Sequence, residues 1–245
     1  MSAAEARPLN QASRDIKQQS VDVRRAFVRK VYGILTTQLL LTVAVAVAIW
    51  QCGQDSSWLR SHEWLLWLSI GMTFATMCLM ICCQPLCRRF PTNYFFLFTF
   101  TAFEGVMVGF VTALFTWESL MLAAGLTVLI FFLLTAYAFN SRTDFTGYGP
   151  YLFGLLSVLG VFGLVLLILP IFNVSVGMVT VLYDMLGVLV FTLYIVFDTQ
   201  LILGEYGGHR LSFSIDDYVF AALNLYMDII NLFLHVLSLF GQRRD

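Results

Sequence analysis

Four polar residues that could bind a proton or a cation recur along the apolar stretch Leu223–Leu239. They are Asn224, Asp228, Asn231 and His235, separated by gaps of four, three and four residues. This spacing places all four on one face of a helix. A carboxylate at the centre of a bilayer costs about 2.5–3.5 kcal/mol on insertion scales, so it must face protein or water. We therefore expect this helix to lie inside a bundle, with its polar face along a path for ions.

Three further acidic residues, Glu104, Asp184 and Asp198, also lie within apolar segments. No Lys follows Lys30 and no Arg lies inside an apolar segment, so no buried cation pairs with these acids. An acid-lined route suits a cation. Helix geometry places Asp198 about 8 Å and Asp228 about 13 Å below the same membrane edge, and helix tilt can close that difference. Two carboxyl groups within reach would share one proton and sense pH.

The composition is that of a membrane protein. Hydrophobic residues make up 59% of the 245 residues and charged residues 12%, against roughly 25% charged residues in soluble domains. The net charge of −1 predicts no nucleic-acid partner. Residues 1–30 are polar and basic, and we expect a mobile tail in which residues 21–30 form an interfacial helix. Residues 31–245 form one membrane domain with seven apolar segments, each long enough to span a bilayer: 31–50, 64–83, 93–115, 119–139, 148–172, 176–202 and 218–240.

The fold class predicted from this pattern is all-α, a bundle of seven membrane-spanning helices with the C-terminal helix at the centre. Seven Lys and Arg residues precede position 31, whereas the 51–63 loop has only Arg60, and this bias predicts a cytosolic N-terminus. If all seven segments cross, Arg243 and Arg244 lie on the non-cytosolic side, against the rule that basic residues gather on the cytosolic side. The alternative is that the last segment enters the membrane and returns without crossing it. Gly105 and Gly109 form a GxxxG pattern, which permits close helix approach within the bundle.

Two other classes of membrane protein fit the sequence poorly. A retinal-type receptor needs a lysine within the membrane, and the apolar segments contain none. An intramembrane aspartyl protease would use Tyr183-Asp184 as its first motif, but its second motif, Gly-x-Gly-Asp, is absent before Asp228. We therefore expect neither an enzyme nor a bound cofactor.

Four segments together resemble the Bax-inhibitor family, in its lifeguard branch. The two most specific are FTLYIVFDTQ at 191–200 and DYVFAALNLYMDIINLF at 217–233, and RAFVRKVY at 25–32 and RRFPTN at 88–93 fit the same branch. The resemblance covers residue 24 to the end. It implies a seven-helix fold with a central last helix, a location in Golgi or endoplasmic reticulum membranes, protection against apoptosis, and a pH-sensitive Ca²⁺ leak.

The resemblance also implies roles for particular residues. The family's gating pair of aspartates corresponds to Asp198 and Asp228, which would also bind Ca²⁺ transiently as the permeant ion. In the family, an arginine after the second helix latches this pair. When the motifs are aligned at Pro91 and Asn93, that arginine falls on Cys87 of this chain, so the adjacent Arg88 would take its place. The remaining path-lining candidates are Glu104, Asp184, Asn224, Asn231 and His235. The alternative function is a non-conducting membrane protein that binds Ca²⁺ channels or regulators of apoptosis.

Overall fold

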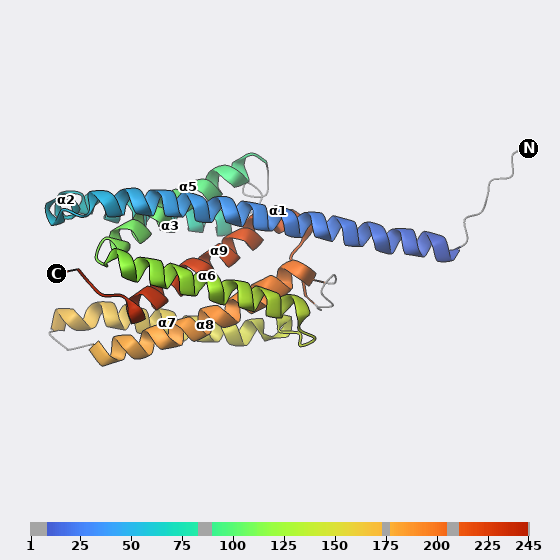
Figure 1. Cartoon of the computed structure of the whole chain (residues 1–245). Helices are drawn as coiled ribbons and strands as arrows, with labels where there is room; N and C mark the ends of the chain where they lie inside the picture. Colours follow the sequence, from blue (N-terminus) through green and yellow to red (C-terminus); the bar gives the residue numbers. More distant parts are fainter. Residues whose placement is uncertain (1–8, 83–89, 173–176, 205–210, 245) are drawn as a thin grey trace, which may run out of the picture.

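The computed structural model describes residues 9–82, 90–172, 177–204 and 211–244. Nearly all of these residues are helical (Figure 1). The helices are α1 (Leu9–Cys52), α2 (Ser56–Ser61), α3 (Glu63–Cys82), α5 (Thr92–Thr112), α6 (Trp117–Asn140), α7 (Gly149–Ile168), α8 (Gly177–Leu203) and α9 (Tyr218–Phe240). Short 3₁₀ turns occupy Thr146–Tyr148, Leu169–Phe172 and Ile215–Asp217.

Within the described ranges, seven helices are long and apolar enough to cross a membrane, and the short α2 is not one of them. The last, α9, is 23 residues long and is one of these seven helices; it lies obliquely through the bundle (Figure 1). The predicted all-α bundle with seven spans is confirmed. We call the two ends of the bundle the N-side, where α9 begins, and the C-side, where α9 ends near the C-terminus (Figure 1).

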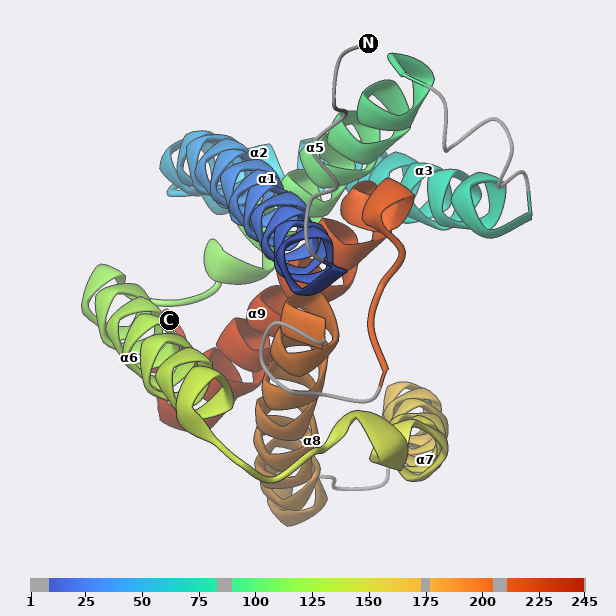
Figure 2. The same cartoon turned by 90° about the vertical axis from the view of Figure 1, so that its right-hand side faces the viewer.

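Helix α9 is the central element of the bundle, as its polar face predicted. Thirteen of its 23 residues are buried, against two of the 20 residues of α7. It packs against α1, α5, α6 and α8, while α3 lies outside α5 and α7 lies outside α8 (Figure 2). The apolar core therefore forms around α9, with fully buried Tyr226, Leu225, Leu232 and Leu237 at its centre.

The GxxxG glycines bring α1 and α5 into close contact. A β-carbon at Gly109 would lie 2.6 Å from the β-carbon of Ile49, and one at Gly105 would lie 3.1 Å from that of Val45. Any larger residue at Gly109 would force the two helices apart. The predicted close approach within the bundle is confirmed.

The N-terminal segment differs from the expected mobile tail. Helix α1 starts at Leu9 and continues without a break into the first membrane span. Phe27 is buried against the bundle, so the first span extends further toward the N-terminus than its apolar residues indicated. The polar composition of residues 9–30 hid this, because a helix that leaves the membrane no longer needs apolar residues.

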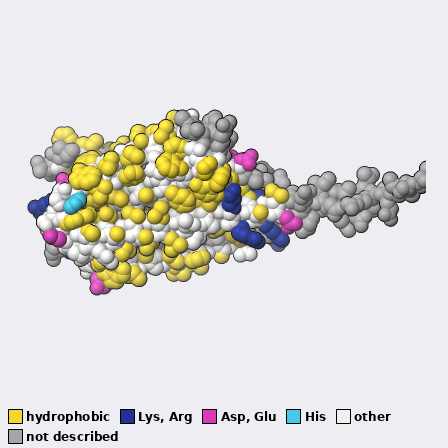
Figure 3. All heavy atoms as spheres, turned by 90° about the horizontal axis from the view of Figure 1, so that it is seen from above, with side chains coloured by type: hydrophobic (Ala, Val, Ile, Leu, Met, Phe, Trp, Pro, Cys, Tyr) yellow, Lys and Arg dark blue, Asp and Glu magenta, His cyan; other side chains and the backbone are white. Residues whose placement is uncertain are grey.

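On the face that Figure 3 shows, apolar side chains are spread along the middle of the bundle, and most of the charged side chains lie toward its ends. Large side chains point outward along the spans, among them Trp67, Phe74, Phe153 and Leu167. A soluble protein rarely exposes apolar patches of this extent. The surface is that of a protein surrounded by lipid.

Candidate functional site

Asp198 and Asp228 meet between α8 and α9. Both side chains are buried, with exposed fractions of 3% and 5%, and their carboxyl groups are within hydrogen-bonding reach of each other. A carboxylate has no donor, so such a bond forms only when one of the two holds a proton. Neither carboxyl group forms an ion pair with a Lys or Arg anywhere in the described ranges. The arrangement can take up a proton or a cation between two helices.

The helix that carries Asp198 is attached to the neighbouring loop immediately beyond it. Gln200 is fully buried; its Oε1 accepts a hydrogen bond from the Phe145 backbone N–H at 2.7 Å, and its Nε2 donates to the Thr143 carbonyl at 2.9 Å. Tyr194, one turn before Asp198, lies close enough to both carboxyl groups to interact with their charge. The sequence analysis did not single out Gln200, although it lies in the motif at 191–200.

Asp184 belongs to a second polar cluster between the same two helices, toward the C-side. Its Oδ1 lies 2.8 Å from Nδ1 of His235, and its Oδ2 accepts a hydrogen bond from the Ser238 hydroxyl. The imidazole ring stacks on Phe191 and contacts Tyr183 edge-on. It also lies against the backbone of Gly187, where a β-carbon would overlap the ring. Both oxygens of Asp184 therefore have partners.

Glu104 lies apart from both clusters, in a third polar group between α1, α5 and α9. Its carboxyl group is buried near the hydroxyl of Tyr226, which lies 2.7 Å from the Thr42 hydroxyl. One turn earlier on α1, Gln38 donates to the Thr101 hydroxyl at 3.0 Å. The buried acids Asp198, Asp228, Asp184 and Glu104 thus lie in three separate groups around α9 within the described residues.

The remaining predicted site residues are placed less centrally. Asn224 is exposed, and half-buried Asn231 donates its side-chain amide to the Met227 carbonyl of its own helix. Of the four polar residues on this face, only Asp228 and His235 are buried against other helices. Arg88, the predicted latch, lies outside the described residues.

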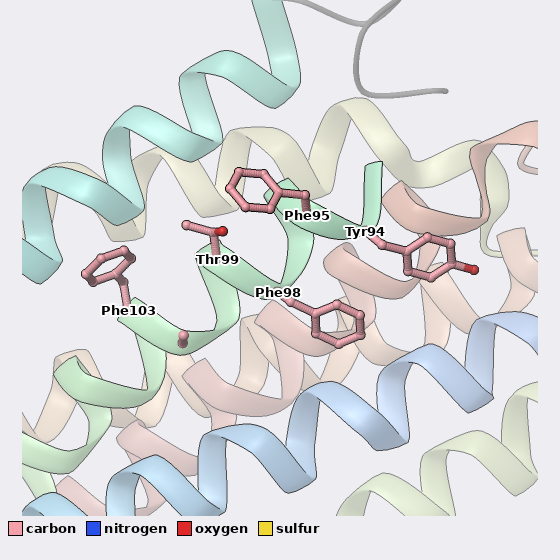
Figure 4. Close-up of a pocket in the computed structure, with 6 residues that line it drawn as sticks. Tyr94, Phe95, Phe98, Thr99 and Phe103 are labelled. Atoms are coloured by element: carbon pink, nitrogen blue, oxygen red, sulfur yellow. The ribbon is translucent and has the colours of Figure 1, made fainter. Parts of the chain in front are cut away.

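Two apolar hollows lie apart from the acidic site. A shallow apolar depression of about 500 Å³ runs along α5, lined by Tyr94, Phe95, Phe98, Thr99, Ala102 and Phe103 (Figure 4). A second cavity of about 290 Å³, between α1, α5, α6 and α9, is lined almost entirely by apolar side chains. Neither contains a carboxylate or an imidazole, so neither offers a site for a cation.

A resident metal ion would need more ligands than the acid pair supplies. Among the described residues, no group of three or more His, Cys, Asp or Glu side chains could hold a metal. Ca²⁺ takes six to eight oxygen ligands, of which two carboxyl groups supply at most four. Any Ca²⁺ between Asp198 and Asp228 would therefore need further oxygen ligands, from water or backbone carbonyls.

Fold and site together define a multi-pass membrane protein whose central helix shares a buried carboxyl pair with its neighbour. The chain belongs to the Bax-inhibitor family: the family described as "Inhibitor of apoptosis-promoting Bax1" matches residues 24–245. Human protein lifeguard 3 is 34% identical over 225 residues, which cover 90% of this chain and 70% of that protein. Bax inhibitor 1 of Schizosaccharomyces pombe is 34% identical over 223 residues, covering 91% and 79%. Mouse protein lifeguard 3 is 32% identical over 225 residues, covering 90% and 70%.

The family predicted from the motifs is thereby confirmed. By their names, the matched family and one relative act against Bax-driven apoptosis. The Bax-inhibitor family is not known as an enzyme family.

Proposed function

We propose that this protein is a pH-sensitive Ca²⁺ leak pathway of Golgi or endoplasmic reticulum membranes, with its N-terminus in the cytosol. By lowering stored Ca²⁺ it would oppose apoptosis, in line with the names of its family and relatives. The observation that carries the proposal is the pair Asp198 and Asp228, two buried carboxyl groups in contact inside a membrane domain.

The pair would act as both gate and proton sensor. One shared proton joins the two side chains and holds α8 against α9. When both are ionised, two negative charges face each other at low effective dielectric and repel, which favours separation of the helices or occupancy by a cation. Acid is therefore expected to oppose the leak. Tyr194 on α8 is a titratable side chain close to both.

Arg88 would serve as the latch of the closed state, as the family resemblance implies. A long cationic side chain at the end of the second span could pair with Asp198 and lower the repulsion within the acid pair. Arg88→Ala is then expected to raise the leak at neutral pH. An unchanged leak would leave Arg88 as an anchor that sets topology.

The test is Ca²⁺ efflux from liposomes that contain the purified full chain as their sole protein. Efflux should exceed that of protein-free liposomes, and its rate should depend on pH. The matched control is Asp198→Asn with Asp228→Asn, which keeps side-chain volume and removes both charges. An ionophore added at the end shows that the vesicles stayed sealed and loaded.

Sealed vesicles that release no Ca²⁺ at any pH would overturn the leak proposal. That outcome favours the other function that fits the family, a non-conducting membrane protein that acts by binding Ca²⁺ channels or regulators of apoptosis.

A further inference from the structure

Arg24 on α1 reaches across the N-side of the bundle to the end of α8. Its three nitrogens each donate to a backbone carbonyl: Nη2 to Leu201 at 2.7 Å, Nε to Leu203 at 3.2 Å, and Nη1 to Phe213 at 2.7 Å. The guanidinium also lies over the ring of Phe27, 4.6 Å from its centroid. One side chain thus joins three segments: α1, the last turn of α8, and the stretch that leads into α9.

The last carbonyls of a helix have no partner within the helix and carry its negative dipole end. Arg24 satisfies two of them with charge-assisted bonds. The Phe213 N–H also donates to Leu201, at 3.1 Å, so the end of α8 and the segment before α9 are bonded to each other as well as to Arg24.

The backbone is shaped to admit the guanidinium. Gly204, directly after α8, has φ of +53°, a conformation that favours glycine. A β-carbon there would lie 2.7 Å from Nη2 of Arg24 and 2.5 Å from the side chain of Ser212. The turn can close around Arg24 only because this residue has no side chain.

Asp198 lies three residues before Leu201, less than one helical turn away. Phe213 lies five residues before the start of α9, the helix that carries Asp228. We infer that Arg24 is a positioning residue that clamps the N-side ends of α8 and α9 together and so keeps the Asp198–Asp228 pair closed. It acts through backbone carbonyls and does not touch either carboxyl group in any contact described above. Where the inference concerns ion flow, it rests on the proposed Ca²⁺ leak.

The clamp itself can be tested without measuring Ca²⁺. Thr199 is fully buried next to Asp198, so Thr199→Cys is a reporter of opening at the N-side in a chain whose five native cysteines are replaced by alanine. A water-soluble maleimide should label it slowly in purified protein. Arg24→Gln should raise the labelling rate about ten- to hundredfold, because charge-assisted hydrogen bonds to the α8 carbonyls are lost.

Three controls separate a local clamp from general destabilisation. Arg29→Gln removes an equal charge from an exposed position on α1 and should leave the rate within about twofold of the parent, as for a surface substitution. Ala123→Cys reports on the C-side, where it is fully buried on α6, and should stay protected when Arg24→Gln is added. Arg24→Lys keeps the positive charge but lacks the planar guanidinium group, so it should give a labelling rate between those of the parent and Arg24→Gln. If Arg24→Gln does not fold, the comparison is made with Arg24→Lys instead.

Unchanged labelling of Thr199→Cys in both Arg24 variants would overturn the clamp, and so would equal gains at Thr199→Cys and Ala123→Cys. Ca²⁺ efflux is then measured on the same variants, in liposomes. If labelling rises in Arg24→Gln while no variant releases Ca²⁺, the clamp stands and the leak function fails. If the parent leaks and Arg24→Gln leaks faster, both stand.

Discussion

Replacing Gly187 by alanine should break the Asp184–His235 contact without touching either residue. A β-carbon at position 187 would lie 2.5 Å from both Cδ2 and Cε1 of the His235 ring, whereas carbon atoms rest about 3.5–4.0 Å apart. The ring must therefore move by roughly 1 Å or more. It cannot swing freely, because Phe191 stacks on one face and Tyr183 meets it edge-on. The 2.8 Å separation of His235 from Asp184 would then exceed hydrogen-bond range.

The expected cost follows from these two effects. Overpacking a buried site costs about 1–3 kcal/mol, and leaving a buried hydrogen-bonding group unsatisfied costs about 1–3 kcal/mol. Alanine regains about 0.5–1 kcal/mol as a better helix former. Gly187→Ala should therefore lower the free energy of unfolding by roughly 1–5 kcal/mol. Unfolding in mixed micelles of increasing SDS fraction, followed by circular dichroism, measures it.

A double-mutant cycle with His235→Ala makes the reasoning refutable. His235→Ala alone removes the hydrogen bond and leaves a cavity, at about 2–5 kcal/mol. With the ring gone, the methyl group at 187 no longer clashes and fills part of that cavity. The double variant should then be no less stable than His235→Ala, which gives a coupling energy about as large as the cost of Gly187→Ala. Additive costs would refute the contact, and Gly125→Ala, with open space around its β-carbon, is the neutral control.

Three further predictions concern gate, packing and a cap. Asp198→Asn and Asp228→Asn should each flatten the pH dependence of Ca²⁺ efflux, and the double variant should add little, because coupled residues act as a unit; wild-type profiles in both single variants would place the sensor elsewhere. Gly109→Ala should lower the free energy of unfolding by about 1–3 kcal/mol through overpacking against α1, measured in the same mixed micelles. Hydrogen bonds from the side chain and backbone of Ser57 lower the pKa of Asp55 below its ordinary 3.8. The stabilisation that this N-cap gives to α2 is therefore complete above pH 3.8 and is lost as the pH falls through the lowered pKa. Hydrogen exchange of the Ser57 amide should accelerate as the pH falls through the lowered pKa of Asp55. Asp55→Asn should remove this pH dependence of the exchange rate.

The number of spans and the central position of α9 could be predicted because both follow from rules local in sequence. Span length needs only a run of apolar residues, and the buried face of α9 shows in the spacing of Asp228 and His235. The contact between Asp198 and Asp228 could also be predicted, because the depth of each residue below a shared membrane edge follows from its position along the helix. The family motifs supplied the pairing itself.

Other contacts leave no trace in the sequence pattern. Arg24 binds backbone carbonyls, and every residue type offers the same carbonyl, so its partners at 201, 203 and 213 could not be identified in advance. One basic residue among several before a membrane span is ordinarily explained by topology. The contact between Asp184 and His235 depends on how α8 and α9 cross, and the glycine that admits the imidazole ring marks it only once the backbone is known.

The two carboxyl clusters along the α8–α9 interface differ in what holds them. Asp184 has a partner for each of its oxygens, in His235 and Ser238 on the neighbouring helix. Asp198 and Asp228 hold each other only through a proton that they must share. On the proposed mechanism, α8 and α9 separate at the N-side, where the Asp198–Asp228 contact would depend on pH. Separation would be hardest at the C-side, where imidazole, hydroxyl and carboxyl are bonded together. The two helices would hinge about the Asp184 cluster, and the attachments at the N-side, Arg24 among them, would set how readily the hinge opens.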